Sequence, residues 1–230
     1  MPVYKPVTHV LFDMDGLLLN TEDLYTVAFQ NILSKFGKEY SFGLKLQLMG
    51  LQSTETADKI ISILDLPLTR EEFMNQTKEQ FELLFPDAQL LPGVKKLLEH
   101  FAKHKVPMGL ATSSSIESYE LKVNKHHKEI FDLFPYKTFG SSDPEVKKGK
   151  PHPDIFIVAA SKFPDKPMFE QCLVFEDAVN GVKAAIAANM QVVMVPDERM
   201  DRALTEQATL VLKSLEQFKP ELFGLPPFDE

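Results

Sequence analysis

One short segment limits what this chain can fold into more than any other: Val10-Leu11-Phe12-Asp13-Met14-Asp15-Gly16, an apolar run that ends in two aspartates and a glycine. The β-forming side chains of residues 10–12 are typical of a central strand that is covered on both faces. Ligands of open parallel sheets bind at the carboxyl ends of the strands, so we expect Asp13 and Asp15 at the mouth of a sheet. Two carboxylates so close together repel each other unless a cation neutralises them, which indicates a metal ion. An acidic turn after a strand is the simpler alternative, because Asp and Gly favour turns.

The order of the predicted elements indicates an α/β fold that is interrupted once. After the first strand, residues 20–87 carry helical patterns only, and Thr69 with Glu72 forms a capping-box signature inside this stretch. From residue 90 onward helices and strands alternate, which predicts a doubly wound parallel sheet with a Rossmann-like core. We therefore expect an α/β core of residues 1–19 and 88–230 and an inserted all-helical cap subdomain of residues 20–87. The predicted strands cover residues 8–13, 108–112, 137–140, 172–176 and 191–195.

Two smaller features carry expectations about local structure. Asn189 lies where a predicted helix turns into a strand, and Asn is the usual substitute for Gly in the left-handed conformation that such a turn needs. His126 and His127 are expected on the solvated surface of a helix.

Three further segments form a pattern with the first one. They are Leu110-Ala111-Thr112-Ser113 at the end of an apolar strand, Lys150-Pro151-His152-Pro153 before a helix, and Val174-Phe175-Glu176-Asp177 followed by Asn180-Gly181. Together with residues 13–16 they resemble, in order and in spacing, the four motifs of the haloacid dehalogenase-like phosphotransferase superfamily. The resemblance covers essentially the whole chain and implies the transfer of a phosphoryl group.

The resemblance implies a role for each residue that matches a motif. Asp13 is the expected nucleophile, which attacks a phosphate ester and forms an aspartyl-phosphate. Asp15 is the expected general acid for the leaving alkoxide and later the base that activates water. Thr112, through its hydroxyl and nearby backbone N–H groups, is expected to bind the transferring phosphoryl group, and Lys150 to steady it.

A divalent cation belongs to the same expectation. A phosphate dianion that approaches Asp13, Asp15, Glu176 and Asp177 would be repelled without compensating charge, and Mg²⁺ is a hard cation that prefers oxygen ligands. By resemblance, the ligands are the Asp13 carboxylate, the main-chain carbonyl of Asp15 and the Asp177 carboxylate. Glu176 is an additional ligand, directly or through water. Mg²⁺ is therefore the expected cofactor.

The substrate is expected to lie between this site and the cap. The cap segment 48–54 carries a glycine, which allows a close backbone approach, and neutral polar side chains that can hydrogen-bond. Phosphoglucomutases of the superfamily carry cations in the cap loop and just after the second motif, whereas residues 113–117 here carry none. This favours a singly phosphorylated substrate and hydrolysis over a mutase reaction. The residues expected beside the substrate are Met14, Gly16, Gly50, Gln52, Ser53 and Ser113.

The likeness extends to segments outside the motifs. Residues 12–19, 141–146, 172–178 and 218–226 resemble the animal pseudouridine-5′-phosphatases. This resemblance implies hydrolysis of pseudouridine 5′-phosphate, and a sugar or polyol phosphate such as hexose 6-phosphate or glycerol 3-phosphate is the alternative. Asn20 departs from the pattern, in which Asp is usual, although Asn can still cap the helix that follows.

Composition narrows the class of partners and the compartment. The formal net charge of −8 argues against a nucleic-acid or anionic-membrane surface, because binding to a phosphate backbone needs a basic footprint. Cys172 is the only cysteine, so no intramolecular disulfide can form and the chain fits a reducing compartment. No apolar run resembles a transmembrane span or a signal peptide. We expect a monomeric cytoplasmic enzyme that acts on a small-molecule phosphate monoester and binds neither nucleic acid nor membrane.

Other classes of protein share part of this pattern. A phospho-acceptor signalling domain also combines an aspartate, a lysine and Mg²⁺ on a doubly wound sheet, but it has no helical insertion after its first strand. A metal-free dehalogenase shares the nucleophile but needs no second acid such as Asp15. A binding protein without activity would lack one of Asp13, Asp15, Lys150 or Asp177, and all four are present.

Overall fold

A six-stranded parallel sheet forms the centre of residues 3–229, the part of the chain that the computed structural model describes. Its strand order is β3-β2-β1-β4-β5-β6, so the order reverses beside β1, which lies between β2 and β4. This confirms the doubly wound α/β sheet that the alternation of elements predicts. The strands are β1 His9–Phe12, β2 Met108–Thr112, β3 Tyr136–Phe139, β4 Cys172–Glu176, β5 Gln191–Met194 and β6 Leu210–Val211.

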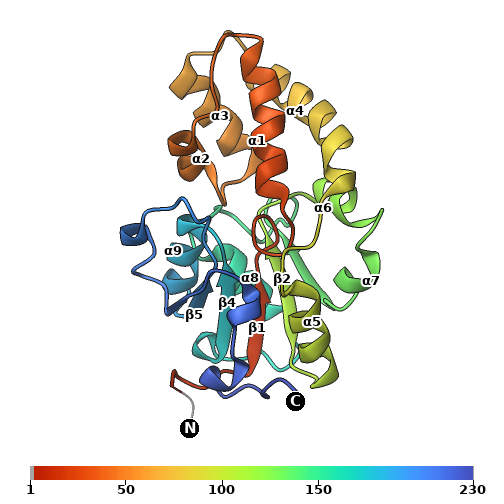
Figure 1. The fold of residues 1–230 in the computed structure, drawn as a ribbon, viewed down its shortest axis with the longest axis vertical. Helices are drawn as coiled ribbons and strands as arrows, with labels where there is room; N and C mark the ends of the chain where they lie inside the picture. The colour runs from red at the N-terminus through yellow and green to blue at the C-terminus, as the bar shows by residue number, and fades with distance from the viewer. Residues whose placement is uncertain (1–2, 230) are drawn as a thin grey trace.

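Helices cover both faces of the sheet, and α1 to α4 lie between β1 and β2 in the chain (Figure 1). The α-helices are α1 Thr21–Ser34, α2 Phe42–Leu48, α3 Ser53–Leu64, α4 Arg70–Leu84, α5 Val94–Lys103, α6 Ile116–Val123, α7 Lys128–Phe131, α8 Asp154–Ser161 and α9 Val179–Ala187. Short 3₁₀ helices are Phe85–Asp87, Phe169–Gln171, Arg202–Leu204, Leu215–Gln217 and Pro220–Phe223. Within residues 3–229, none of the helices has the length and apolar character that a membrane span requires.

Each face of the sheet has its own apolar cluster, because successive side chains of a strand point to opposite faces. Val10 and Phe12 pack in one cluster with residues of α5 and α7, whereas Leu11 packs in the other with residues of α8 and α9. Phe12 stacks on Phe175 of β4 with ring centroids 4.5 Å apart. Burial of an aromatic or aliphatic side chain contributes about 1.5–3 kcal/mol. The strand that leads into Asp13 is therefore firmly held from both sides.

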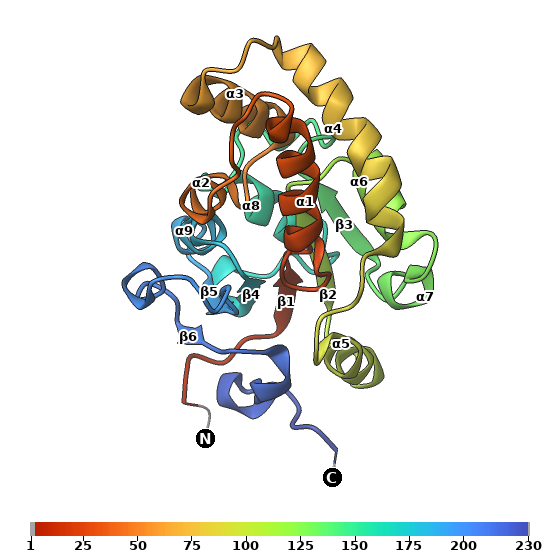
Figure 2. The same ribbon diagram turned by 45° about the horizontal axis from the view of Figure 1, so that its top comes forward.

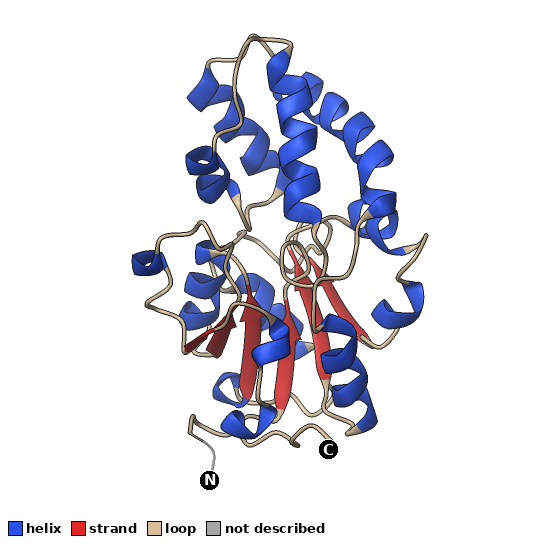
Figure 3. Cartoon of the chain, viewed as in Figure 1, coloured by secondary structure: helices blue, strands red, loops and turns tan. Residues whose placement is uncertain are grey.

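The helices α1 to α4 have a core of their own and lie together above the sheet in Figure 3. Phe29, Ile32 and Phe73 are buried in this core, which shares no residue with the two sheet clusters. The predicted capping box opens α4: the Thr69 hydroxyl accepts the Glu72 N–H, and the Glu72 carboxylate accepts the Thr69 N–H at 2.8 Å. The all-helical insertion is confirmed, whereas its limits at residues 20 and 87 stay a prediction.

The insertion covers the end of the sheet where β1 leads into α1 (Figure 2). The connecting loop folds back on itself, because Gly16 N–H donates to the Leu19 carbonyl at 2.9 Å and Leu18 N–H donates to the Met14 carbonyl at 3.0 Å. Gly16 has a φ of +81°, which glycine adopts without steric cost. The loop can therefore carry Asp13 and Asp15 in a tight turn at the edge of the sheet.

The two local expectations have different outcomes. Asn189 adopts a φ of 62° between α9 and β5, so the left-handed turn is confirmed. The expectation that His127 is solvated is wrong: its side chain is buried, and its Nε2 lies 2.7 Å from the Ala88 carbonyl oxygen. The sequence pattern could not show this, because the partner belongs to the segment that returns from the helical insertion.

Candidate active site

The carboxyl ends of β1, β2 and β4 bring the predicted motif residues together. Parallel register places Phe12 of β1 beside Leu110 of β2 and Phe175 of β4. The residues that follow these positions are therefore neighbours, and Asp13 N–H donates to the Phe175 carbonyl at 3.0 Å. Asp13, Thr112, Glu176 and Asp177 are all buried at this end of the sheet, as is Lys150 from the loop between β3 and α8.

Lys150 joins two of these carboxylates. Its side chain is fully buried, and its Nζ donates to Asp13 Oδ1 and to Glu176 Oε1, each at 2.6 Å. Burial alone would lower the pKa of Lys150, but the two carboxylates raise it above its ordinary value. Lys150 is therefore an ammonium fixed beside Asp13; its expected role in steadying a phosphoryl group stays a prediction.

Glu176 is held so that it can anchor Lys150. Its Oε2 accepts the backbone N–H groups of Asp177 at 3.1 Å and Ala178 at 3.2 Å, while its Oε1 accepts Lys150. Both oxygens thus have partners within the protein.

Asp13, Glu176 and Asp177 form an acidic cluster whose ligand atoms all lie within 4.8 Å of one another. Burial, with the charges of Glu176 and Asp15, raises the pKa of Asp13 to about 8 against the opposing effect of Lys150. Burial, with the charges of Glu176, Asp13 and Glu22, also raises the pKa of Asp177 well above its ordinary value. One ammonium does not balance three carboxylates, and an all-oxygen donor set fits a hard divalent cation such as Mg²⁺.

Asp15 lies in a different environment from Asp13. Its Oδ1 accepts the Thr21 hydroxyl and Lys122 Nζ, both at 2.6 Å, and its Oδ2 accepts the hydroxyls of Ser114 at 2.8 Å and Thr112 at 3.4 Å. Burial would raise the pKa of Asp15, but Lys122 and the hydroxyl donors lower it below its ordinary value. The two aspartates of the first motif are therefore held by separate lysines.

The sequence analysis did not find several of these partners. Lys122 on α6 is fully buried, and besides Asp15 it donates to Ser114 Oγ at 2.8 Å and to the Tyr25 hydroxyl at 3.0 Å. The only signal in the sequence is that this lysine stands between Leu121 and Val123, which is equally typical of a solvated helix position. Its role depends on how α6 packs below the helical insertion.

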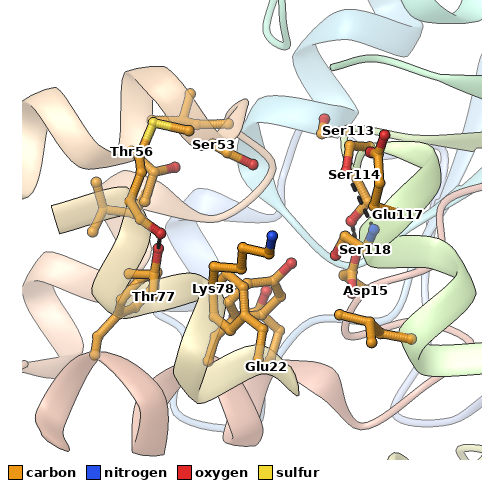
Figure 4. A pocket seen from close by; sticks show the side chains of 18 of the residues that line it. Asp15, Glu22, Ser53, Thr56, Thr77, Lys78, Ser113, Ser114, Glu117 and Ser118 are labelled. Atoms are coloured by element: carbon orange, nitrogen blue, oxygen red, sulfur yellow. Dashed lines mark hydrogen bonds between the residues drawn. The ribbon is translucent and has the colours of Figure 1, made fainter. Parts of the chain in front are cut away.

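A cavity of about 930 Å³ lies between this end of the sheet and the cap. Asp13, Asp15 and Asp177 line its core side, and Figure 4 shows Ser53, Thr56 and Thr77 of the cap facing Ser113, Ser114 and Ser118 across it. Aromatic side chains form much of the cap wall. They are Tyr25, Phe29, Tyr40, Phe73 and Phe81.

The residues predicted beside the substrate have mixed outcomes. Gly50, Ser53 and Ser113 line the cavity. Gln52 does not line it, because its amide donates to the Gly140 carbonyl at 2.6 Å and ties the cap segment to the core. Two further residues also lie outside this lining: the Met14 side chain is buried in the sheet core, and Gly16 lines a second cavity of about 230 Å³.

Two lysines that the sequence analysis did not single out also line the main cavity. Lys78 of α4 lies 3.9 Å from Glu82, and Lys125, which follows α6, lies 2.6 Å from Asp87. Both are exposed and each faces a carboxylate. Such exposed pairs are weak, so both lysines remain cations of the cavity lining, outside the segments 48–54 and 113–117.

The chain is similar to known hydrolases over nearly its whole length. Residues 10–195 match the family model described as haloacid dehalogenase-like hydrolase. A Drosophila melanogaster protein named probable pseudouridine-5′-phosphatase is 52% identical over 228 residues, which cover 99% of this chain and 98% of that protein. An Arabidopsis thaliana protein named (DL)-glycerol-3-phosphatase 2 is 43% identical over 227 residues, which cover 97% of this chain and 94% of that protein.

A solved structure supports the same architecture. The crystal structure of β-phosphoglucomutase from Clostridium difficile matches with a TM-score of 0.74 and 24% identity, covering 94% of this chain and 94% of that chain. At this identity the likeness concerns the fold: a doubly wound sheet with a helical insertion after the first strand.

Proposed function

Because this chain belongs to the haloacid dehalogenase-like hydrolase family, we propose that it hydrolyses small phosphate monoesters through an aspartyl-phosphate on Asp13, with pseudouridine 5′-phosphate as substrate. The observation that carries the proposal is the separate pairing of the two aspartates on the floor of one cavity, Asp13 with Lys150 and Asp15 with Lys122. In the absence of a cation the pKa of Asp13 is raised and that of Asp15 is lowered, so the proposed roles require a cation to favour ionised Asp13 and the incoming phosphate dianion to favour protonated Asp15.

The reaction has two halves. First, Asp13 Oδ attacks phosphorus in line, the P–O bond to the alcohol breaks, and Asp15 gives a proton to the departing alkoxide. Then Asp15 takes a proton from water, the water oxygen attacks phosphorus, and the bond from phosphorus to Asp13 breaks to release inorganic phosphate. Thr112, at the end of β2, and the backbone N–H groups after it support the transferring group.

The acidic cluster supports Mg²⁺ as the cofactor. Asp13, Asp177 and the Asp15 carbonyl would hold the cation, with Glu176 reached through water. When bound, it neutralises the carboxylates and the incoming phosphate, and favours the ionised form of Asp13. Lys150 then remains the only protein cation in direct contact with the Asp13 carboxylate among the described residues.

The size and lining of the cavity support a nucleoside monophosphate over a smaller ester. About 930 Å³ is near the upper end of the range of about 300–1,000 Å³ for small-molecule sites, so glycerol 3-phosphate would leave much of it filled with water. Of the aromatic side chains in the cap wall, Tyr25 and Phe81 are only partly buried, so their rings offer surface to a planar base. Ser53, Thr56 and Ser113 offer neutral hydrogen-bonding groups to its polar edges.

Glycerol 3-phosphate is the second candidate, because the Arabidopsis relative carries that activity in its name. The deciding measurement is kcat/KM for pseudouridine 5′-phosphate, uridine 5′-phosphate, glycerol 3-phosphate and a hexose 6-phosphate at one Mg²⁺ concentration. We expect pseudouridine 5′-phosphate to exceed uridine 5′-phosphate by about tenfold, as one extra hydrogen bond to its additional ring N–H would provide. A clear preference for the glycerol or hexose ester would refute this substrate and leave the phosphatase activity standing.

The last part of the proposal concerns the oligomeric state and the compartment of the enzyme. We propose a monomer in the cytoplasm, supported by the buried free thiol of Cys172, which fits a reducing compartment. Size-exclusion chromatography with light scattering tests the oligomeric state.

A further inference from the structure

A buried lysine that no motif of the family includes contacts the acid–base residue and the cap at the same time. Lys122 Nζ lies 2.6 Å from Asp15 Oδ1, 2.8 Å from Ser114 Oγ and 3.0 Å from the Tyr25 hydroxyl. Tyr25 stands on α1 of the cap, whereas Ser114 and Lys122 belong to the core. The ammonium therefore joins two parts of the chain that are far apart in sequence: residues 15–25, which include the first motif and the start of α1, and residues 114–122.

Aromatic rings enclose the same ammonium. Its Nζ lies 5.0 Å from the centroid of the Tyr25 ring and 4.7 Å from that of Phe85, and the side chain is fully buried. Such rings attract a cation through their faces. Lys122 has little freedom to move away from Asp15 unless α1 and the segment around Phe85 move with it.

Both carboxylate oxygens of Asp15 accept hydrogen bonds from neighbouring side chains. Thr21, at the start of α1, and Lys122 share Oδ1, while Ser114 and Thr112 approach Oδ2. Two of these contacts lead into the cap: Thr21 directly, and Lys122 through Tyr25. The orientation of the Asp15 carboxyl group therefore depends on the position of α1.

From these contacts we infer that Lys122 is a positioning residue: it fixes the carboxyl group of Asp15 for proton transfer and couples it to cap helix α1 through Tyr25. The inference rests on the proposed function, because it concerns the acid–base group of that reaction. Lys122 does not touch the substrate in this arrangement, since it is absent from the lining of the cavity. It acts through Asp15.

A substrate whose leaving group needs no proton can distinguish a loss of Asp15 positioning from a general disruption of the active site. p-Nitrophenyl phosphate releases a stable phenolate, so its first turnover needs attack by Asp13 but no proton from Asp15, whereas hydrolysis of the aspartyl-phosphate needs Asp15 as base. In Lys122→Met we expect steady-state turnover of both this ester and pseudouridine 5′-phosphate to fall roughly tenfold to a hundredfold. The first-turnover burst of p-nitrophenolate should keep its wild-type rate, and the KM for this ester should fall together with kcat, because hydrolysis of the phosphorylated intermediate then limits turnover.

Two further variants keep the test decisive. Tyr25→Phe retains the ring and removes only the hydroxyl, so it should fold and show the same pattern with a smaller loss. Lys45→Met is the matched control, because Lys45 is also a buried lysine, but it pairs with Glu22 at 3.5 Å and makes no contact with Asp15. It should leave the ratio of burst rate to steady-state rate unchanged.

The outcomes are distinguishable. An equal fall of burst and steady-state rates in Lys122→Met, or no fall in either, would overturn the positioning role, and wild-type behaviour of Tyr25→Phe would overturn the coupling to α1. Inactivity of the wild-type enzyme on every ester would overturn the proposed function and this inference together.

Discussion

Gly181 of α9 packs against the carboxylate of Glu176 so closely that a Cβ atom at residue 181 would overlap both carboxylate oxygens. Helix α9, which follows β4, can therefore pack closely against the acidic cluster because residue 181 has no side chain. Glu176 in turn holds Lys150 at 2.6 Å, and Lys150 holds Asp13 at the same distance. A glycine with no chemistry of its own thus supports the position of the proposed nucleophile.

This contact predicts opposite effects for two glycine substitutions in helices. Gly181→Ala should lower the free energy of unfolding by about 1–3 kcal/mol, as overpacking of a dense site does, and should reduce kcat by displacing Glu176 and Lys150. Gly43→Ala in α2 is the control, because it is exposed with only Ser41 Oγ nearby at 4.0 Å. It should stabilise the protein by about 0.5–1 kcal/mol. Urea unfolding and steady-state assays measure both, and an equal response of the two variants would contradict the packing argument.

Replacement of either aspartate should separate the two halves of the reaction. Asp13→Asn removes the nucleophile at nearly constant volume, so turnover should fall to background while the far-UV circular dichroism spectrum stays that of the wild type. Asp15→Asn leaves the nucleophile, so a phosphorylated protein should form slowly and persist, because no base activates water. Mass spectrometry after brief incubation with substrate would detect the phosphoryl adduct. Substantial steady-state turnover by Asp13→Asn would rule out the covalent mechanism.

The motif residues could be predicted because one topological fact locates them. The carboxyl ends of neighbouring parallel strands meet at one edge of a sheet, so Asp13, Thr112 and Asp177 had to lie near one another once their segments were identified as strands. The helical insertion was also readable, since its apolar residues recur at helical spacing and Thr69 opens α4 with a capping box. Both inferences depend on local patterns.

Contacts between the cap and the core could not be predicted in this way. Lys122 and Gln52 are polar residues whose partners, Asp15 and the Gly140 carbonyl, are distant in the chain. No periodicity marks such pairs, because they depend on how one body of helices sits on the sheet. The same limit explains His127, whose partner Ala88 lies in the returning segment.

Asp13 also predicts how the stability of the protein without metal depends on pH. Burial and the neighbouring carboxylates raise its pKa to about 8, whereas an Asp side chain in an unfolded chain titrates near about 3.9. Between these values the folded state binds the proton more strongly than the unfolded state, so the contribution of this group to stability falls as pH rises. In excess chelator, the Tm of Asp13→Asn minus the Tm of the wild type should therefore increase as pH rises from about 4 to about 8, because only the wild type loses this contribution. A difference in Tm that stays constant across this window would contradict the assignment.

Removal of the cation should abolish activity and lower stability together. Chelation leaves Asp13, Glu176 and Asp177 with Lys150 as their only direct ammonium partner among residues 3–229, so a phosphate dianion should be repelled and turnover lost. Mg²⁺ should restore turnover and raise the Tm, because a ligand that binds only the folded state adds about 2.7 kcal/mol when present at a hundred times its Kd. Calorimetry at pH 7 should show proton release on Mg²⁺ binding, since carboxyl groups with raised pKa must ionise. Full activity in excess chelator would refute the metal-dependent mechanism.

The aromatic wall of the cavity leads to a test of the substrate that needs no change in the reacting groups. Phe81 of α4 lines the cavity and is only partly buried; it stacks on Phe85 with ring centroids 4.3 Å apart, and we expect the exposed part of its ring to contact a planar base. Stacking of a base on an aromatic side chain contributes about 1–3 kcal/mol, so Phe81→Leu should lower kcat/KM for pseudouridine 5′-phosphate by roughly fivefold to a hundredfold. Glycerol 3-phosphate has no ring to stack, and its kcat/KM should stay close to the wild-type value. Phe42→Leu is the matched control, because Phe42 also belongs to the cap but packs under Arg199, outside the cavity lining. A parallel loss of kcat/KM for both esters in Phe81→Leu would mean that the ring shapes the cap as a whole, and the nucleoside assignment would lose the support of the cavity.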